Sequence, residues 1–354
     1  MAATDEPRDV RDEDRIDGAR VDAFLRRHVD GLRGDPSIRQ FPGGASNLTY
    51  LIAYGEREFV LRKPPAGAKA KSAHDMLREA RVMAALQPHF PCVPAVVAAC
   101  DDPSVLGSDF FVMERLRGII LRRDLPPDLG LDDAGVRKLG EAFVDRLVAL
   151  HRIDASDPSI AALGKGEGYV ARQVAGWSDR WRKALTDGTD ACEDVVAWLA
   201  SGQPCDAATC VIHNDWRFDN VVLDAHDPLS IVGVLDWEMA TLGDPLMDLG
   251  GALAYWVQAD DEPAFRALRR QPTHVRGMPT RADVVALYAR RSGLAIDRFD
   301  FYEVFGLFRL MVIIQQIWRR YVLGQTSNPQ FAGFGDAVRT LSDRCRRLVA
   351  AAET

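Results

Sequence analysis

Short runs of strand-like, mostly apolar residues separated by polar turns dominate the first third of the chain, with one helical segment among them. Strand-like runs at 50–54 and 59–63, the second of which ends in Arg62 and Lys63, lie on either side of a glycine-containing turn, so the pattern predicts a β-hairpin. A further apolar run at 110–114 predicts another strand. Residues 75–87 carry apolar side chains three and four positions apart, which predicts a helix. We therefore expect an antiparallel sheet with one inserted helix.

From about residue 118 the period changes to that of helices. Apolar residues three or four positions apart run from 136 to 150 and again from 304 to 322, the last long helix that the pattern predicts. One compact strand-rich segment lies between them, with short apolar runs at 210–212, 220–223 and 231–235. The change of period predicts an α+β chain of two lobes, a sheet lobe at 1–117 and a mostly helical lobe at 118–354.

The composition indicates a folded protein and argues against nucleic acid as its partner. With 354 residues, of which 47% are hydrophobic and 27% charged, the chain is long and apolar enough for a packed core. Lys and Arg number 44 against 51 Asp and Glu, and no block of Lys and Arg occurs, so nucleic acid is not expected as a partner. Residues 1–16 are charged and poor in apolar side chains, and we expect them to be frayed.

Neither a membrane span nor an export signal is expected. The most apolar stretch, 307–317, is interrupted by Arg309, Gln315 and Gln316 and is shorter than the roughly 20 residues that a span needs. The N-terminus lacks the apolar segment of a signal peptide, so a cytoplasmic protein is expected. The six cysteines show no metal-ligand spacing and are expected to be free, mostly buried thiols.

The strand-rich segment of the second half carries a group of acidic and amide side chains. His213 and Asp215 are followed by Asn220, and Asp236 comes after two short strands. Phosphoryl transfer from ATP needs a carboxylate that orients the acceptor hydroxyl, and an acid and an amide that hold Mg²⁺ against the phosphates. Asp215, Asn220 and Asp236 supply that set. A hydrolytic metal site formed by His213, Asp215 and Asp236 is a second interpretation of the same residue types.

Two charged residues of the first lobe lie where apolar residues are expected. Glu79 falls between two methionines on the apolar face of the predicted helix, and a carboxylate in a core is costly unless it is paired. Lys63 shares its strand face with Phe59 and Leu61. Because the two charges are of opposite sign, we predict an ion pair between Lys63 and Glu79.

Together these residues resemble the aminoglycoside phosphotransferase and choline kinase family, relatives of the protein kinases. The match extends over most of residues 40–250, and its motifs are similar to those of the kinase-like domain fused to some acyl-CoA dehydrogenases. The resemblance implies a bilobal protein-kinase-like fold and an ATP- and Mg²⁺-dependent kinase whose partner is a small molecule with a hydroxyl group. It implies Asp215 as the catalytic base and Asn220 and Asp236 as Mg²⁺ ligands. Lys63, held by Glu79, would be the phosphate-binding lysine.

Further nucleotide contacts follow from the same resemblance. The loop before the first strand of the hairpin contains Gly43, Gly44, Ser46 and Asn47, and its position favours a phosphate-covering role, with the last two residues as donors. Backbone groups of Glu114, Arg115 and Leu116 would form the adenine-binding hinge. Glu238 is either an outer contact of the metal site or a structural carboxylate.

The acceptor is the least specified part of the prediction. Aminoglycosides are polycations and call for an acidic pocket, whereas Arg309, Arg319 and Arg320 on or beside the last predicted helix suit an anionic ligand. The resemblance favours a hydroxyacyl-CoA or hydroxy acid acceptor over an aminoglycoside. The alternative is a catalytically silent nucleotide- or CoA-binding module that regulates a partner enzyme.

Overall fold

The computed structural model describes residues 6–42, 47–65 and 75–354, and the chain divides into two compact units. The first unit extends to Ile120 and also takes in 126–129 and 219–240, and the second comprises 121–125, 130–218 and 241–354. The sequence suggested one boundary near residue 117. In the structure, residues 219–240 belong to the first unit instead. The reason is that a strand in this range pairs with the strand at Ile119–Ile120.

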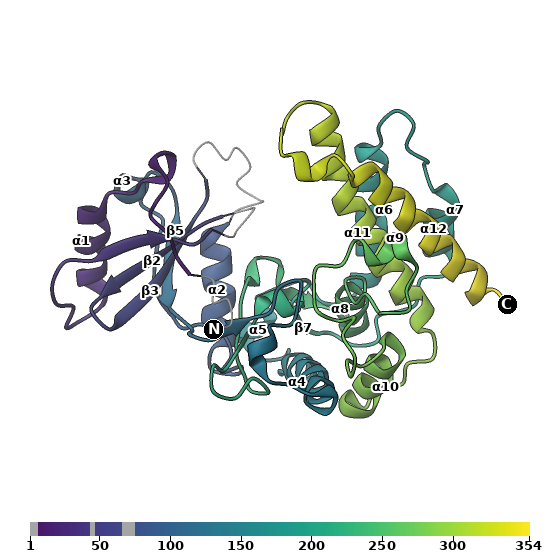
Figure 1. Cartoon of the computed structure of the whole chain (residues 1–354), viewed down its shortest axis with the longest axis horizontal. Coiled ribbons are helices and arrows are strands. Elements are labelled where there is room, and N and C mark those ends of the chain that lie inside the picture. The colour runs from purple at the N-terminus through teal and green to yellow at the C-terminus, as the bar shows by residue number, and fades with distance from the viewer. Residues whose placement is uncertain (1–5, 43–46, 66–74) are drawn as a thin grey trace. The chain divides into compact units, whose positions relative to one another are not determined.

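An antiparallel sheet of five strands forms the centre of the first unit (Figure 1). The predicted hairpin and the predicted strand at 110–114 are confirmed. Gly55 turns the chain within the hairpin at a φ of 61°, a left-handed conformation that glycine adopts without strain. In spatial order the strands are β1 (Ser37–Gln40), β2 (Leu48–Tyr54), β3 (Arg57–Lys63), β5 (Phe110–Glu114) and β4 (Val96–Cys100).

Helices pack on this sheet. The apolar side of α1 (Gly18–His28) shares a core with Phe59 and Leu61 of β3, and α3 (Pro103–Leu106) follows β4 on the same side. The predicted inserted helix is confirmed as α2 (Met76–Leu86), which packs against β4 and β5. Because side chains alternate along a strand, Val60 and Arg62 of β3 point away from α1 and toward α2.

The N-terminal segment is not frayed over the residues that the structure describes, 6–16. Arg8 and Gln40 exchange backbone hydrogen bonds of 2.7 Å, and the buried side chain of Gln40 bonds the Arg11 amide and the Asp14 carboxylate. The Tyr50 hydroxyl donates to the Asp14 carbonyl at 2.6 Å, beside the short helix η1 (Asp12–Asp14). The expectation failed because these polar bonds, together with Val10 and Ile16 packed against the core of the first unit, hold the segment in place.

The strand-rich segment of the second half divides between the two units. In the first unit, β6 (Ile119–Ile120), β8 (Val221–Leu223) and β9 (Ile231–Val234) form an antiparallel sheet. In the second unit, β7 (Cys210–Ile212) pairs with β10 (Thr241–Gly243). The expected single compact segment is therefore wrong. Short helices here are η2 (Pro127–Leu129), η3 (Phe218–Asn220) and η4 (Trp237–Met239).

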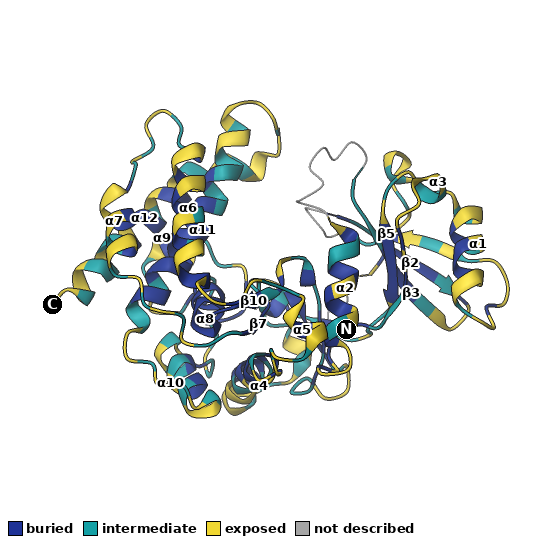
Figure 2. Ribbon diagram, turned by 180° about the vertical axis from the view of Figure 1, so that it is seen from behind, coloured by how far each residue is buried: buried dark blue, intermediate teal, exposed yellow. Residues whose placement is uncertain are grey.

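The second unit is built on α11 (Phe299–Val322), which packs against α6 (Tyr169–Ala184), α8 (Pro245–Leu253) and α12 (Phe334–Ala352). A Cβ on Gly306 of α11 would lie 2.1 Å from the Gly250 oxygen of α8, so glycine is required where these helices cross. All residues of α8 are buried and drawn dark blue in Figure 2. The other elements are α4 (Asp133–His151), α5 (Pro158–Ala161), α7 (Glu193–Ser201), α9 (Pro263–Arg266), α10 (Arg281–Ser292) and η5 (Pro329–Phe331).

Two sequence expectations about this unit can be compared with the structure. The helix predicted at 304–322 is confirmed as α11, but it is not the last long helix, since α12 follows it. By length and composition α11 could cross a membrane, yet 67% of its most apolar window is buried within the structure, as is typical of a core helix. All six cysteines are free, and only Cys205 is exposed, so the expected free thiols are confirmed.

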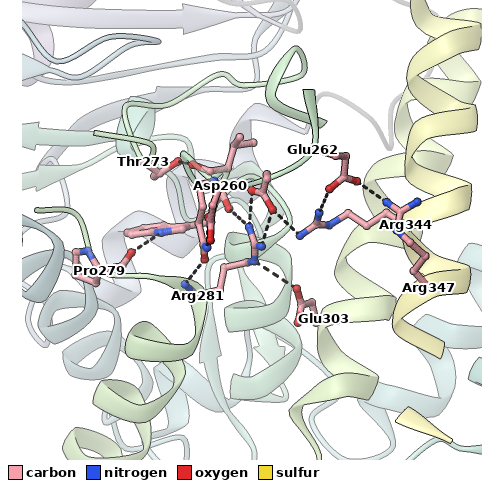
Figure 3. A network of polar contacts seen from close by, with 12 residues as sticks. Asp260, Glu262, Thr273, Pro279, Arg281, Glu303, Arg344 and Arg347 are labelled. Carbon is pink, nitrogen blue, oxygen red and sulfur yellow. Dashed lines mark hydrogen bonds and ion pairs between the residues drawn. The ribbon is translucent and has the colours of Figure 1, made fainter. Parts of the chain in front are cut away.

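A network of ion pairs joins α10 and α12 to the segment between α8 and α9 (Figure 3). The Asp261 carboxylate is 4% exposed and accepts hydrogen bonds from Arg281 at 2.7 and 2.8 Å and from Arg344 at 3.0 Å. Glu262 accepts from Arg344 at 2.9 Å and also pairs with Arg347. Every charge named here has a partner of opposite sign, so no charge of this network is left uncompensated in the second unit.

Candidate functional site

An arginine whose side chain is 13% exposed lies at the centre of the acidic cluster in the first unit. Arg62, on the face of β3 toward α2, donates from Nη1 to Glu79 Oε1 at 2.5 Å. Its Nη2 donates at 3.1 Å to Oδ1 of Asp236, the residue immediately before η4. The Glu79 side chain is 1% exposed and that of Asp236 is 34% exposed. Arg62 thus connects a fully buried carboxylate to one that solvent and ligands can reach.

The predicted ion pair between Lys63 and Glu79 is wrong. Lys63 shares its strand face with Phe59 and Leu61 as expected, but that face packs against α1, whereas Glu79 belongs to α2 on the other side. The Lys63 ammonium donates to the Leu106 carbonyl at 3.1 Å, and burial lowers its pKa. The neighbouring residue, Arg62, takes the position that was predicted for Lys63.

Burial and charge act against each other in this cluster. Burial raises the pKa of Glu79 to about 7, although the charge of Arg62 opposes this shift and the charges of Asp236 and Glu238 reinforce it. Burial alone would lower the pKa of Arg62, but the carboxylates of Glu79 and Asp236 raise it above its ordinary value. Arg62 therefore carries a permanent positive charge that only partly offsets the acidic groups around it.

Glu238 connects the start of β2 to the same cluster. The buried Asn47 side chain donates from Nδ2 to Glu238 Oε2 at 3.0 Å. Arg78 of α2 donates to the backbone oxygens of Glu238 at 2.8 Å and of Ala240 at 2.6 Å. These contacts favour the structural alternative for Glu238, and they engage the Asn47 amide that was predicted to face a phosphate. Gly43, Gly44 and Ser46 of the predicted glycine loop lie outside the described residues.

Asn220 and Asp236 meet at one end of the β8–β9 pair. Val221 pairs with Val234, and the Leu235 amide donates to the Asn220 carbonyl at 2.8 Å, so Asp236 follows directly beside Asn220. Asp236 has a φ of 68°, a conformation that few residues other than glycine adopt. Such a backbone is retained where the surroundings fix it, which is frequent at functional sites.

The donors at this position fit a hard divalent cation. Mg²⁺ prefers oxygen ligands, and Asn220 and Asp236 contribute an amide oxygen and a carboxylate. The carboxylates of Glu79, Asp236 and Glu238 all act on the Arg62 guanidinium, so acidic groups outnumber this cation. Within the ranges that the structure describes, no group of three or more His, Cys, Asp or Glu side chains is placed to hold a metal ion. The hydrolytic set of His213, Asp215 and Asp236 draws on both units and stays an untested alternative.

The predicted hinge follows β5 and is held by Glu58. The Glu114 amide donates to the Ala95 carbonyl at 2.9 Å, and the Arg115 amide donates to the Glu58 carbonyl. The Glu58 carboxylate pairs with Arg115 and Arg117, each at 2.9 Å. Leu116 packs so closely on Gly233 that a Cβ there would lie 2.4 Å from its Cδ1. Adenine binding by Glu114, Arg115 and Leu116 stays a prediction.

Within the second unit, hydrogen bonds to α8 hold the loop that carries Asp215. Asp248 of α8 accepts from the His213 amide at 2.7 Å and from the Asn214 amide at 2.8 Å. Burial opposes ionisation of Asp248, but its bond to His151 and the nearby histidines hold its pKa below the ordinary value. His151 in turn contacts the Tyr288 hydroxyl at 2.6 Å. This loop is therefore anchored by a charged acceptor with defined hydrogen bonds.

Asp215 itself points toward a cation. Its Oδ1 lies 3.1 Å from Nε of Arg217, and both side chains are about one fifth exposed, at 21% and 20%. The Asp215 amide donates to Nδ1 of His213 at 3.2 Å, so His213 braces the loop. Arg217 lies over the ring of Tyr255, 4.8 Å from its centroid. Arg217 was not singled out from the sequence. Its place two residues after Asp215, a spacing at which a cation can pair with a carboxylate, was the available signal.

Comparison with known proteins identifies the family of this chain. Residues 37–284 match the phosphotransferase enzyme family, which is more than half of the chain. The chain belongs to this family. Acyl-CoA dehydrogenase family member 10 of Mus musculus is 33% identical over 326 residues, covering 90% of this chain and 30% of that protein. Across the acyl-CoA dehydrogenase family members 10 and 11 that it matches, the chain spans 30% to 45% of their length.

Solved structures support the fold of this phosphotransferase family member. A provisionally assigned aminoglycoside phosphotransferase of Ralstonia eutropha JMP134 has a TM-score of 0.81 and 29% identity, covering 95% of this chain and 99% of its own. A mutant aminoglycoside phosphotransferase in complex with AMP-PNP and hygromycin B has a TM-score of 0.58 and 17% identity, covering 93% and 98%. The predicted bilobal kinase-like α+β fold is confirmed. The comparisons support a phosphotransferase that acts on small molecules.

Proposed function

We propose that this chain transfers the γ-phosphoryl group of ATP to a hydroxyl group of a small molecule in the presence of Mg²⁺. The observation that carries the proposal is the cluster of Arg62, Glu79 and Asp236, in which a cation suited to a phosphate lies beside an oxygen donor suited to a metal. Family membership and the nucleotide analogue held by a solved relative support it.

Each residue has a defined part in the proposed reaction. Asp215 accepts a hydrogen bond from the acceptor hydroxyl and takes its proton, while Arg217 holds the carboxylate in place. The hydroxyl oxygen bonds to the γ-phosphorus as the bond from that phosphorus to the bridging oxygen of ADP breaks. Arg62 neutralises phosphate charge. Asn220 and Asp236 would hold Mg²⁺, which supplies further positive charge at the phosphates.

The acceptor in this proposal is a hydroxyacyl-CoA or a hydroxy acid rather than an aminoglycoside. Arg217 lies directly beside Asp215, and its positive charge disfavours a polycation next to the reacting hydroxyl. The names of the curated relatives, acyl-CoA dehydrogenase family members, point to the same class of substrate.

A thermal-shift titration with ATP and GTP, with and without Mg²⁺, tests the nucleotide site. Ligands that bind only the folded state raise the melting temperature by mass action. We expect Mg²⁺-dependent stabilisation of the wild-type protein, loss of that dependence in Asp236→Ala, and its retention in the control Asp101→Ala, which alters an exposed carboxylate of the same unit. No stabilisation by either nucleotide at millimolar concentration would contradict the proposal.

A further inference from the structure

Arg309 of α11 donates from Nη2 to the Asn214 carbonyl at 2.7 Å, immediately before Asp215. From this contact we infer that Arg309 is a positioning residue, which sets the direction of the Asp215 side chain by holding Asn214. The inference rests on the proposed role of Asp215 as the catalytic base. It also reassigns Arg309, which the sequence had grouped with arginines suited to an anionic ligand.

The guanidinium of Arg309 is buried inside the second unit, next to an aromatic ring and a glycine. The residue is 8% exposed, and its guanidinium carbon lies 5.4 Å from the centroid of the Trp177 ring in α6. A Cβ on Gly251 of α8 would lie 3.1 Å from Nη1 of Arg309, so the absence of a side chain at Gly251 leaves space for the guanidinium. Burying a guanidinium costs free energy unless its N–H groups donate hydrogen bonds.

The residue that Arg309 holds has an unusual backbone. Asn214 has a φ of 66°, in the left-handed region, where a residue other than glycine costs roughly 1–3 kcal/mol unless its surroundings fix it. Its side-chain Oδ1 accepts from the Tyr169 hydroxyl of α6 at 3.0 Å, and its amide donates to Asp248 of α8 at 2.8 Å. Three elements, α6, α8 and α11, therefore fix one residue from its carbonyl, its side chain and its amide.

This arrangement connects the core helix α11 to the catalytic carboxylate. The peptide between Asn214 and Asp215 carries the oxygen that Arg309 binds, so its orientation determines where the Asp215 side chain leaves the loop. A misplacement of about 1 Å at a reacting group costs on the order of 100-fold in rate. Arg309→Ala should thus lower kcat by about 100-fold and leave KM for ATP nearly unchanged.

Rescue with guanidinium separates positioning from a general structural role. Arg309→Ala leaves a guanidinium-sized space next to Trp177 and Gly251, so millimolar guanidinium chloride should restore part of kcat for hydroxybutyryl-CoA. Urea has the same shape without the charge, and sodium chloride has the ionic strength without the shape, so neither should restore it. Arg182→Ala, which removes an exposed arginine of α6 paired with Glu193, is the matched control and should keep wild-type kcat.

Hydrogen exchange gives a second measurement that does not depend on activity. Arg309→Ala should speed amide exchange in a peptide covering 213–217 by about tenfold or more, an opening cost of roughly 1.4 kcal/mol, and guanidinium should slow it again. Arg309→Lys keeps the charge without the planar guanidinium, so it should produce a smaller change, and it serves as the test if Arg309→Ala does not fold. If the wild-type protein transfers no phosphoryl group, the proposed function fails while the exchange result still decides this inference. Unchanged exchange in both variants, or rescue of kcat by urea as well as by guanidinium, would overturn it.

Discussion

Replacing Glu79 by glutamine should change how the stability of the first unit depends on pH. Glu79 is 1% exposed, and burial raises its pKa from 4.5 to about 7 despite the bond to Arg62. A carboxylate whose pKa is higher in the folded state binds its proton more tightly there. Its favourable contribution is therefore complete below about pH 4.5 and is lost as the pH rises through about 7.

The size of the effect follows from that shift. The change from 4.5 to about 7 at 1.36 kcal/mol per pH unit corresponds to about 3 kcal/mol. The side-chain amide introduced by Glu79→Gln cannot ionise, so the variant lacks this loss. Relative to the wild-type protein, Glu79→Gln should therefore gain about 3 kcal/mol in the free energy of unfolding between pH 4 and pH 8.

The assay is urea unfolding at a series of pH values, with amide exchange of peptides from α2 and β3 as the signal for the first unit. Comparing the difference between variant and wild type across pH removes any constant effect of the substitution. Glu56→Gln, an exposed carboxylate in the β2–β3 turn, is the control and should show a much smaller change. A pH-independent difference for Glu79→Gln, or a loss of relative stability as pH rises, would refute the reasoning.

Three further predictions concern the cation, the base and the polar network. Arg62→Met should weaken Mg·ATP binding at least about tenfold by calorimetry, whereas Lys63→Met should change it only slightly, because Lys63 contacts the α1 side of the sheet. Asp215→Asn should lower kcat by about 100-fold or more while leaving the nucleotide-induced thermal shift intact. Asp261→Asn should lower the free energy of unfolding by about 3 kcal/mol in urea, since it leaves the buried Arg344 and the partly buried Arg281 with a neutral partner. Equal effects at Arg62 and Lys63, wild-type kcat in Asp215→Asn, or an unchanged urea midpoint in Asp261→Asn would contradict each in turn.

Local patterns predicted the elements of this fold well, because a strand or helix buries the side chains that its own period presents. The hairpin of β2 and β3 and the helices α2 and α11 follow directly from that rule. The pattern could not say which face of the sheet α2 covers. That missing fact moved the predicted ion pair by one residue, from Arg62 to Lys63.

The partners of short segments could not be predicted from the sequence either. β7 and β8 are both short, buried apolar runs, yet β7 pairs with β10 and β8 with β6 and β9, since three-residue strands carry little register information of their own. Arg309 was predicted to suit an anionic ligand, whereas in the structure it is 8% exposed and contacts Trp177 of α6. In each case the contact is formed between segments far apart in the chain, which spacing alone does not specify.

Product analysis tests the central claim most directly. The protein is incubated with Mg²⁺ and ATP whose γ-phosphoryl oxygens carry a heavy isotope, together with hydroxyacyl-CoAs, hydroxy acids and aminoglycosides, and the mass of each acceptor is measured by mass spectrometry. The account predicts ADP and one labelled phosphate ester, formed from a hydroxyacyl-CoA or hydroxy acid and absent with Asp215→Asn. Wild-type protein that binds Mg·ATP yet forms no labelled ester and releases no labelled phosphate would contradict it and indicate a regulatory nucleotide-binding module.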